Sequence, residues 1–225
     1  MRIVQTNFFG DHNLGLYAKC SDKICIIGSS LSKKNEDNIS TALDARIIKT
    51  TLSGTDFVGL FIAMNSNGII LPNIIKKLEL EKIKTLLKSF GLNLLVLNSK
   101  FNCMGNLILC NDNGAIISKT FSKIAKKKIE GALGIESDYG TLYGMNIVGS
   151  TAVATNKGCV VHRDAKDEEI KKIEEMLKVQ TDVGTANFGS PFVGSSLFAN
   201  SHGAVVGDST TGPEVDRIQE TLGFR

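Results

Sequence analysis

Five glycines recur along the chain at a nearly constant spacing. Gly15, Gly59, Gly105, Gly149 and Gly194 are separated by 44, 46, 44 and 45 residues, and five units of about 45 residues account for all 225 residues. A period of this length indicates one supersecondary unit repeated along the chain, which constrains the fold more than any local pattern does.

A second glycine strengthens the repeat. In the last four copies it follows the first glycine after nine residues, at Gly68, Gly114, Gly158 and Gly203. An apolar run ending near an asparagine lies between the two glycines: LFIAMNSNG, NLILCNDNG, STAVATNKG and SSLFANSHG. The first copy is degenerate, with Ile24 where the second glycine would stand.

The second copy shows the predicted structure of one unit. Residues 60–65 form an apolar run of strand length, and 66–68 (Ser-Asn-Gly) predict a hairpin turn in which asparagine and glycine supply positive φ angles. The run resumes at 69–71, a helical pattern follows over about 75–90, and 94–97 predict a third strand. The unit therefore reads as β-turn-β-α-β.

The other copies carry similar helical patterns. The apolar stripes are Ile170, Ile173 and Leu177 in the fourth copy, and Phe121, Ile124, Ile129 and Leu133 in the third. In the fifth, Thr211 and Glu214 make a capping box with Pro213 in the first turn. The first helix, around 39–43, has the weakest pattern.

These units predict a closed ring. A single unit cannot bury both faces of its sheet, and closure removes the exposed strand edges. We expect an α/β (α+β) fold, a single domain of five β-β-α-β repeats around a pseudo-fivefold axis. Its helices lie outside, and the glycine-adjacent strands and turns surround the axis. The repeats are approximately 1–50, 51–97, 98–140, 141–184 and 185–225.

Composition excludes several classes of protein. No apolar stretch approaches the roughly 20 residues of a membrane span, and the N-terminus lacks the apolar centre of a secretory signal, so we expect a cytoplasmic protein. Five cysteines without metal-ligand spacing predict free thiols. We expect no metal site and no cofactor, and a net charge of +3 is too small to indicate nucleic acid.

Three segments carry a family resemblance. Residues 184–214 (GTANFGSPFVGSSLFANSHGAVVGDSTTGPE), 148–162 (VGSTAVATNKGCVVH) and 104–114 (MGNLILCNDNG) resemble archaeal translation initiation factor 6, a family homologous to the eukaryotic ribosome anti-association factor. The resemblance runs through the whole chain, including FFGDHNLG at 8–15. It implies the pentein fold, five such units around a pseudo-fivefold axis.

The resemblance also implies a function without catalysis. Members bind the intersubunit face of the large ribosomal subunit, chiefly at a ribosomal protein beside the sarcin–ricin loop and possibly at the loop RNA. Occupying that surface sterically blocks the small subunit. We accordingly expect a monomer with no catalytic residue, no membrane or DNA partner, and an accessory role in large-subunit maturation.

The ribosome-facing end of this family is built around the repeated glycine. Asn106, a polar side chain directly after Gly105 where its neighbours suggest a strand, is the strongest candidate contact. Its equivalents in the other repeats are Leu16, Leu60, Ser150 and Ser195. Residues expected on the adjoining loops are Asn13, Asn146 and Phe192.

Three other functions remain as alternatives. The same fold hosts enzymes that modify guanidino groups with a cysteine nucleophile and a histidine, for which Cys159 and His162 or His202 would serve. However, 159 and 162 point to opposite faces of a strand, and both histidines are expected in turns or loops. Lys33-Lys34 or 126–128 could bind RNA, although lysine runs on outer helices are usually solvated faces. The segment 207–212 lacks the lysine of a nucleotide-binding loop.

Overall fold

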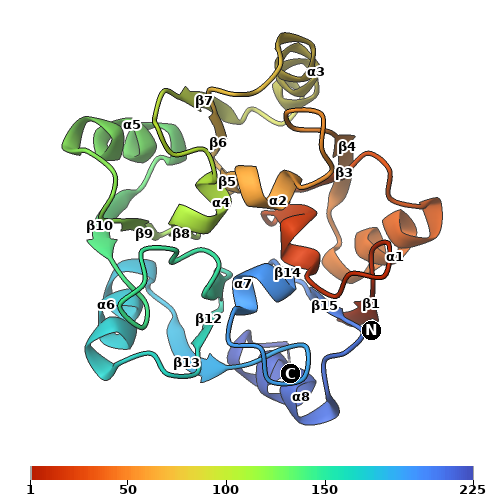
Figure 1. Cartoon of the computed structure of the whole chain (residues 1–225), viewed down its shortest axis with the longest axis vertical. Helices are drawn as coiled ribbons and strands as arrows, with labels where there is room; N and C mark the ends of the chain where they lie inside the picture. Colours follow the sequence, from red (N-terminus) through yellow and green to blue (C-terminus); the bar gives the residue numbers. More distant parts are fainter. Residues whose placement is uncertain (1, 225) are drawn as a thin grey trace.

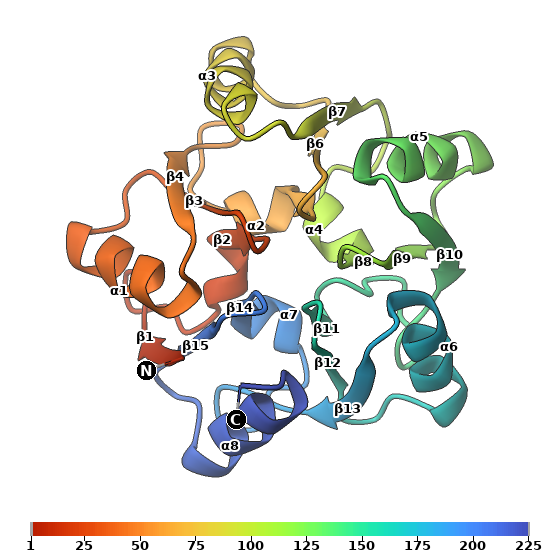
Figure 2. The same cartoon turned by 180° about the vertical axis from the view of Figure 1, so that it is seen from behind.

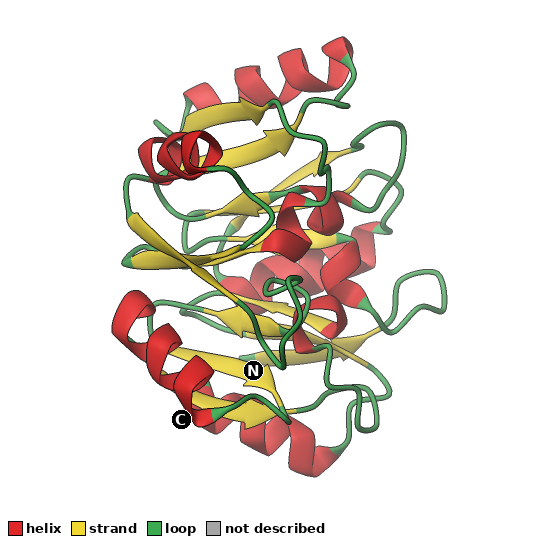
Figure 3. Cartoon of the chain, turned by 60° about the vertical axis from the view of Figure 1, so that its left-hand side comes forward, coloured by secondary structure: helices red, strands yellow, loops and turns green. Residues whose placement is uncertain are grey.

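The computed structural model describes residues 2–224 and shows five three-stranded sheets arranged in a ring around one axis (Figure 1). A long helix covers the outside of each sheet, and the view from behind shows the same arrangement (Figure 2). The strands run roughly through the thickness of the disc (Figure 3). The predicted ring of five mixed units with external helices is therefore confirmed.

Each unit repeats the same order of elements: an antiparallel strand pair, an outer helix, and a third strand parallel to the second. The first unit contains β2 (Ala18–Cys20), β3 (Ile24–Gly28), α1 (Lys33–Leu43) and β4 (Arg46–Thr50). The second contains β5 (Ala63–Met64), β6 (Gly68–Pro72), α3 (Lys77–Lys88) and β7 (Asn93–Leu97). The third contains β8 (Ile108–Cys110), β9 (Gly114–Ser118), α5 (Lys123–Leu133) and β10 (Glu136–Gly140). The fourth contains β11 (Ala152–Ala154), β12 (Gly158–His162), α6 (Asp167–Leu177) and β13 (Gln180–Gly184).

The fifth unit is completed by the beginning of the chain. Its own elements are β14 (Leu197–Ala199), β15 (Ala204–Gly207) and α8 (Gly212–Thr221). The third strand is β1 (Ile3–Thr6), which pairs in parallel with β15 from Ile3 opposite Ala204 to Thr6 opposite Gly207. The ring is thus closed by backbone hydrogen bonds between the two ends of the chain.

In four of the five units a short helical turn, not a strand, surrounds the repeated glycine: η1 (Leu14–Leu16), α2 (Val58–Phe61), α4 (Met104–Leu107) and α7 (Val193–Ser196). Around Gly149 the chain makes a turn in which the Ser150 N–H donates to the Ile147 carbonyl at 3.0 Å. The predicted strand 60–65 is therefore wrong in its first half, and Asn106 lies in α4 and not on a strand. Apolar residues can be buried in a single helical turn as well as in a strand. A short apolar run therefore does not distinguish a helical turn from a strand.

The five repeated glycines pack backbone to backbone around the axis. A Cβ atom at Gly105 would collide with the carbonyl oxygens of Gly59 and Ile62, and every other repeated glycine meets the preceding one in the same way. Between the third and fourth units, the Gly149 N–H also donates to the Asn106 carbonyl at 2.8 Å. Only a residue without a side chain permits this approach, which explains the period in the sequence.

The second set of glycines lets each hairpin approach the helix of a neighbouring unit. A Cβ at Gly68 would collide with the carbonyl of Ala132 in α5, and one at Gly114 with that of Met176 in α6. The preceding asparagine fixes the same contact: the Asn65 side-chain amide donates to the carbonyl of Leu133 at 2.9 Å. It thereby satisfies a carbonyl that the end of a helix leaves without a partner.

This contact corrects the reason that the sequence suggested for these residues. Among the described residues, none in the four hairpin turns that end in the second glycine has a positive φ. These turns are 65–68, 111–114, 155–158 and 200–203. The glycines are required by the neighbouring helix and the asparagines by its last carbonyls. Ile24 takes the glycine position in the first unit, where it packs in a core that includes Ile83 and Leu87 of α3.

The helical stripes are confirmed with one exception. Ile173 and Leu177 are buried in α6, Ile129 and Leu133 in α5, and the capping box of Thr211 and Glu214 begins α8. Ile124 is instead 71% exposed, because α5 begins at Lys123 and its second residue points outward. Within residues 2–224, no helix has the length and apolar character needed to cross a membrane.

Replacing Gly105 with alanine should disrupt the ring. The collision with two backbone carbonyls cannot relax without moving a neighbouring unit, so we expect a loss of more than about 3 kcal/mol in the free energy of unfolding. Gly131→Ala is the matched control, since nothing lies within 4 Å of a Cβ there, and alanine in a helix should be neutral or stabilise by up to about 1 kcal/mol. Urea unfolding followed by circular dichroism measures both, and equal stability of the two variants would contradict the packing argument.

Candidate functional site

One end of the ring, here called the front face, is built from the short helical turns and the loops that precede them. The loops span 7–13, 51–57, 98–103, 141–147 and 185–192. This end faces the viewer in Figure 1, with α2, α4 and α7 around its centre. The opposite end carries the hairpin turns.

All the residues predicted for the site lie at this end. The residues that directly follow the repeated glycines surround the axis: Leu16, Leu60, Asn106 and Ser195 are half-buried, and Ser150 is buried. Asn13, Asn146 and Phe192 are exposed in the adjoining loops. The structure thus brings the predicted residues to one surface, although it does not by itself assign a contact to any of them.

Three exposed aromatic side chains were missed by the sequence reasoning. Phe9, Tyr143 and Phe188 are 64%, 53% and 84% exposed, and they occupy equivalent places in three front-face loops. Each has a positive φ, of 58°, 51° and 62° respectively, and each is followed by a glycine with positive φ. Bulky residues seldom adopt this conformation, which persists only where the surrounding structure holds it.

Glutamates at the start of three outer helices hold three of the front-face loops, including those of Tyr143 and Phe188. The carboxylate of Glu169 accepts hydrogen bonds from the backbone N–H of Tyr143 at 2.8 Å and of Gly144 at 3.3 Å, and from the N–H of Lys166 in its own helix at 3.1 Å. Glu79 braces the loop at 51–54 in the same way, and Glu214 the loop at 185–189.

These hydrogen bonds also change the ionisation of the glutamates. Burial alone would raise the pKa of each carboxyl group, but the donated hydrogen bonds outweigh it and hold the pKa of Glu79, Glu169 and Glu214 below the ordinary value of 4.5. The carboxylates are therefore ionised at neutral pH, and the loops keep one shape.

His162 packs against two aromatic side chains of the front face, Tyr143 and Phe192. Its ring stacks on Tyr143 with centroids 4.9 Å apart and an angle of 11°, and it meets Phe192 edge-on at 6.0 Å. Burial lowers the pKa of His162, and its Nδ1 accepts the Asp164 N–H at 3.1 Å, so the ring is neutral. His162 is the last residue of β12, which corrects its predicted place in a turn, whereas exposed His202 does lie in a hairpin turn.

The arrangement does not support the cysteine-nucleophile alternative. Cys159 is fully buried in the core between β12 and α6, and burial raises the pKa of its thiol. His162 lies on the other face of the same strand, against the front-face aromatics. Nucleophilic catalysis needs an accessible thiolate beside a base, and this pair provides neither.

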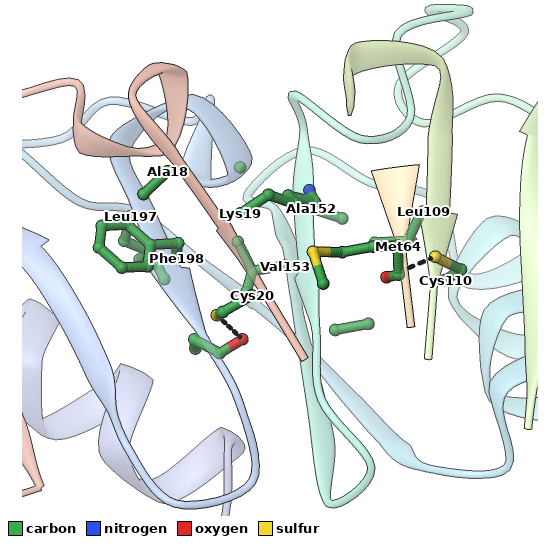
Figure 4. A pocket seen from close by; sticks show the side chains of 13 residues that line it. Ala18, Lys19, Cys20, Met64, Leu109, Cys110, Ala152, Val153, Leu197 and Phe198 are labelled. Atoms are coloured by element: carbon green, nitrogen blue, oxygen red, sulfur yellow. Dashed lines mark hydrogen bonds between the residues drawn. The ribbon is translucent and has the colours of Figure 1, made fainter. Parts of the chain in front are cut away.

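The axis of the ring is filled rather than open. A cavity of about 30 Å³ remains beneath the glycines, with room for about one or two water molecules. Figure 4 shows Lys19 lying beside Ala152 in this cavity. The Cys20 thiol donates a hydrogen bond to the Ala199 carbonyl, and the Cys110 thiol donates one to the Met64 carbonyl. Burial lowers the pKa of Lys19 and raises the pKa of Cys110 to about 11. Within residues 2–224, no cluster of three or more metal-ligating side chains is present.

Comparison with known proteins identifies close relatives. Residues 3–221 match the eIF-6 family. The chain is 46% identical to translation initiation factor 6 of Pyrococcus furiosus, with both chains covered completely, and 47% identical to that of Thermococcus kodakarensis over all of this chain and 99% of the relative. The factor of the same name from Methanocaldococcus jannaschii is 39% identical over 99% of this chain and 98% of the relative.

A solved structure shares the fold at much lower identity. A Cys-to-Ser mutant of DDAH from Pseudomonas aeruginosa, in complex with citrulline, superposes with a TM-score of 0.50 and 12% identity. The match covers 76% of this chain and 68% of that one. This similarity supports the pentein fold and carries no information about activity.

Removing the charge of Glu169 should loosen one front-face loop. In Glu169→Gln the amide keeps one acceptor oxygen but loses the ionic hydrogen bonds to Tyr143 and Gly144, so we expect their amide hydrogen exchange to accelerate about tenfold. Glu168→Gln, at an exposed position on the same helix, should leave those amides unchanged. Unchanged exchange in both variants would show that the glutamate does not hold the loop.

The same glutamates predict sensitivity to acid. Because their folded pKa values are depressed, their stabilisation is complete above about pH 4.5 and is lost as the pH falls through the lower, folded values. Thermal unfolding between pH 7 and pH 3 should show this fall in the wild type. In the triple variant Glu79→Gln, Glu169→Gln, Glu214→Gln, the unfolding temperature should be lower at pH 7 and should change less below pH 4.5.

Proposed function

This chain belongs to the eIF-6 family, and from that membership we propose that it binds the intersubunit face of the large ribosomal subunit and sterically prevents premature association with the small subunit. Its relatives are named as translation initiation factors, so a role in translation is the premise. The surface that we assign to the ribosome is the front face. The partner there is a ribosomal protein beside the sarcin–ricin loop, with the loop RNA as a further contact.

The observation that carries this proposal is a rigid docking face without a reaction site. The front face is fixed at its centre by the packed glycines and at its margin by the glutamate-braced loops. A stable protein interface needs about 800 Å² per partner, which is less than a tenth of the 9575 Å² surface of this protein. A steric block requires no chemistry, only a surface that stays occupied.

The exposed aromatic residues supply plausible anchors for such an interface. Tyr and Phe are enriched at protein interfaces, and Tyr is also enriched among the residues that contribute most to binding. Rigid aromatic side chains lose little conformational freedom on association. Tyr143 and Phe192 rest on His162, so their positions are set before a partner arrives. Preorganisation of this kind lowers the cost of binding.

Asn106 is suited to a central polar contact. It is half-buried beside the axis, and its backbone carbonyl is already used by the Gly149 N–H. Within the described residues its side-chain amide has no hydrogen-bond partner, which leaves a donor and an acceptor free for another molecule. Leu16, Leu60, Ser150 and Ser195 complete the central ring in our proposal, with Asn13, Asn146 and Phe192 at its edge.

The proposal extends to the state and place of the protein. We infer a monomer, since one ring presents one complete front face. We also infer that the protein acts in the cytoplasm, and that the same binding site gives it an accessory role in large-subunit maturation. The guanidino-modifying alternative is weaker, because Cys159 is buried and His162 is used for packing.

Sedimentation with ribosomal subunits tests the proposal. Archaeal large and small subunits are centrifuged through a sucrose gradient at low millimolar magnesium, with and without the protein. We expect the wild type to co-sediment with the large subunit and to deplete joined ribosomes. Asn106→Ser should weaken large-subunit binding about tenfold, as loss of a central contact does.

Asn38→Ser is the matched control, because Asn38 is also half-buried but lies on the outer helix α1. It should behave as the wild type. If the wild type binds neither subunit and joining is unchanged, the proposed function is wrong. If the wild type binds and both asparagine variants do too, only the assignment of Asn106 is wrong.

A further inference from the structure

The outer helices of two neighbouring units lie in segments with a clear excess of lysine over acidic residues. The segment 76–88, which includes α3, has five lysines against two glutamates, and 119–130, which includes most of α5, has five lysines against one. The whole chain has a net charge of only +3, so the remainder is net negative. Figure 2 shows α3 and α5 in neighbouring units on the rim of the disc, with β6 and β7 between them, and we call this stretch of the rim the basic arc.

The few carboxylates of the basic arc are already engaged within the protein. Glu79 accepts from the front-face loop, and Glu81 pairs with Lys84 at 3.0 Å. Glu130 binds Lys126 at 2.7 Å and also the backbone N–H of Ser137. The other lysines of the arc are exposed and have no carboxylate within ion-pair distance among the described residues: Lys76, Lys77, Lys82, Lys88, Lys119, Lys123, Lys127 and Lys128.

The other outer helices do not share this character. On α1, Lys33 is paired with both Glu36 and Asp37, so the Lys33-Lys34 run is largely neutralised. On α6, Asp167, Glu168 and Glu175 are exposed. The excess positive potential therefore belongs to one sector of the rim and is not a general property of the outer helices.

We propose that the basic arc binds the phosphate backbone of structured ribosomal RNA beside the surface on which the front face docks. The proposal rests on the proposed function, because that function places the rim next to the ribosome. It changes the sequence-based interpretation of the lysine run at 126–128, which predicted a merely solvated face. The added observation is that the lysines of two neighbouring units lie in one sector of the rim, and that every carboxylate of the two segments already has a partner.

The chemistry of the arc favours RNA over an acidic protein. Lysine is depleted in protein–protein interfaces, which need close-packed apolar centres, whereas long flexible ammonium side chains suit the spaced phosphates of a nucleic acid. The arc lies on the convex rim of the ring, where phosphate contacts need no complementary cavity.

Salt dependence provides the test, since each lysine–phosphate contact releases a counterion. The arc variant is Lys77→Gln, Lys123→Gln, Lys127→Gln, and the control is Lys34→Gln, Lys157→Gln, Lys171→Gln, which removes the same charge at exposed lysines outside the arc. Affinity for archaeal large subunits and for a 20-base-pair RNA duplex is measured by fluorescence anisotropy between 50 and 200 mM KCl. We expect the arc variant to bind both about tenfold more weakly at 100 mM, with a slope of log affinity against log salt that is shallower by about two to three.

The control variant should stay within about twofold of the wild type. Equal behaviour of the two variants, whether both unchanged or both weakened, overturns the proposal. If the arc variant loses affinity for subunits but not for the duplex, the arc contacts an acidic ribosomal protein and the RNA assignment is wrong. If the wild type binds the duplex through the arc but no subunit at all, the proposed function fails while the RNA-binding arc stands.

Discussion

The rest of the structure depends on the contact between glycine backbones at the axis of the ring. Each repeated glycine lies against the carbonyl oxygen of the preceding one, so the five units approach as nearly as backbones can. A short turn lies beside each of these glycines, the strands run roughly through the thickness of the disc, and the long helices lie on the rim. The turns that contain the repeated glycines surround the axis and form the centre of the front face.

A second interaction gives the ring its direction. Asn65 and Asn111 each reach the last carbonyls of the neighbouring outer helix, so one unit holds the helix of the next. Asn200 does the same across the junction of the chain ends, where it binds the carbonyl of Leu43 in α1. The hairpin end is therefore stabilised by polar contacts between units, whereas the front end exposes aromatic side chains and the side-chain amide of Asn106.

Much of the fold could be predicted from the sequence, because glycines are required at fixed intervals and the helical stripes are periodic. The turn at 58–61 could not, since an apolar run has the same appearance in a short helix and in a strand. The hairpin asparagines were assigned to turns because their helix partners lie in another unit, about 70 residues away in the case of Asn65. Local patterns cannot show such contacts.

The candidate site was predictable in its position and less so in its content. The residues after each repeated glycine do meet at one surface, as the period requires. The aromatics were missed although a pattern exists: Phe9, Tyr143 and Phe188 each precede a glycine at the repeat spacing. The glutamates three residues into the helices appeared only as caps, and their second role depends on a loop more than 20 residues earlier. Finally, β1 leaves a synthesising ribosome about 200 residues before β15, so it has no partner until β15 has been made. A factor that we assign to ribosomes thus acquires its closed ring only after its last strand has been synthesised.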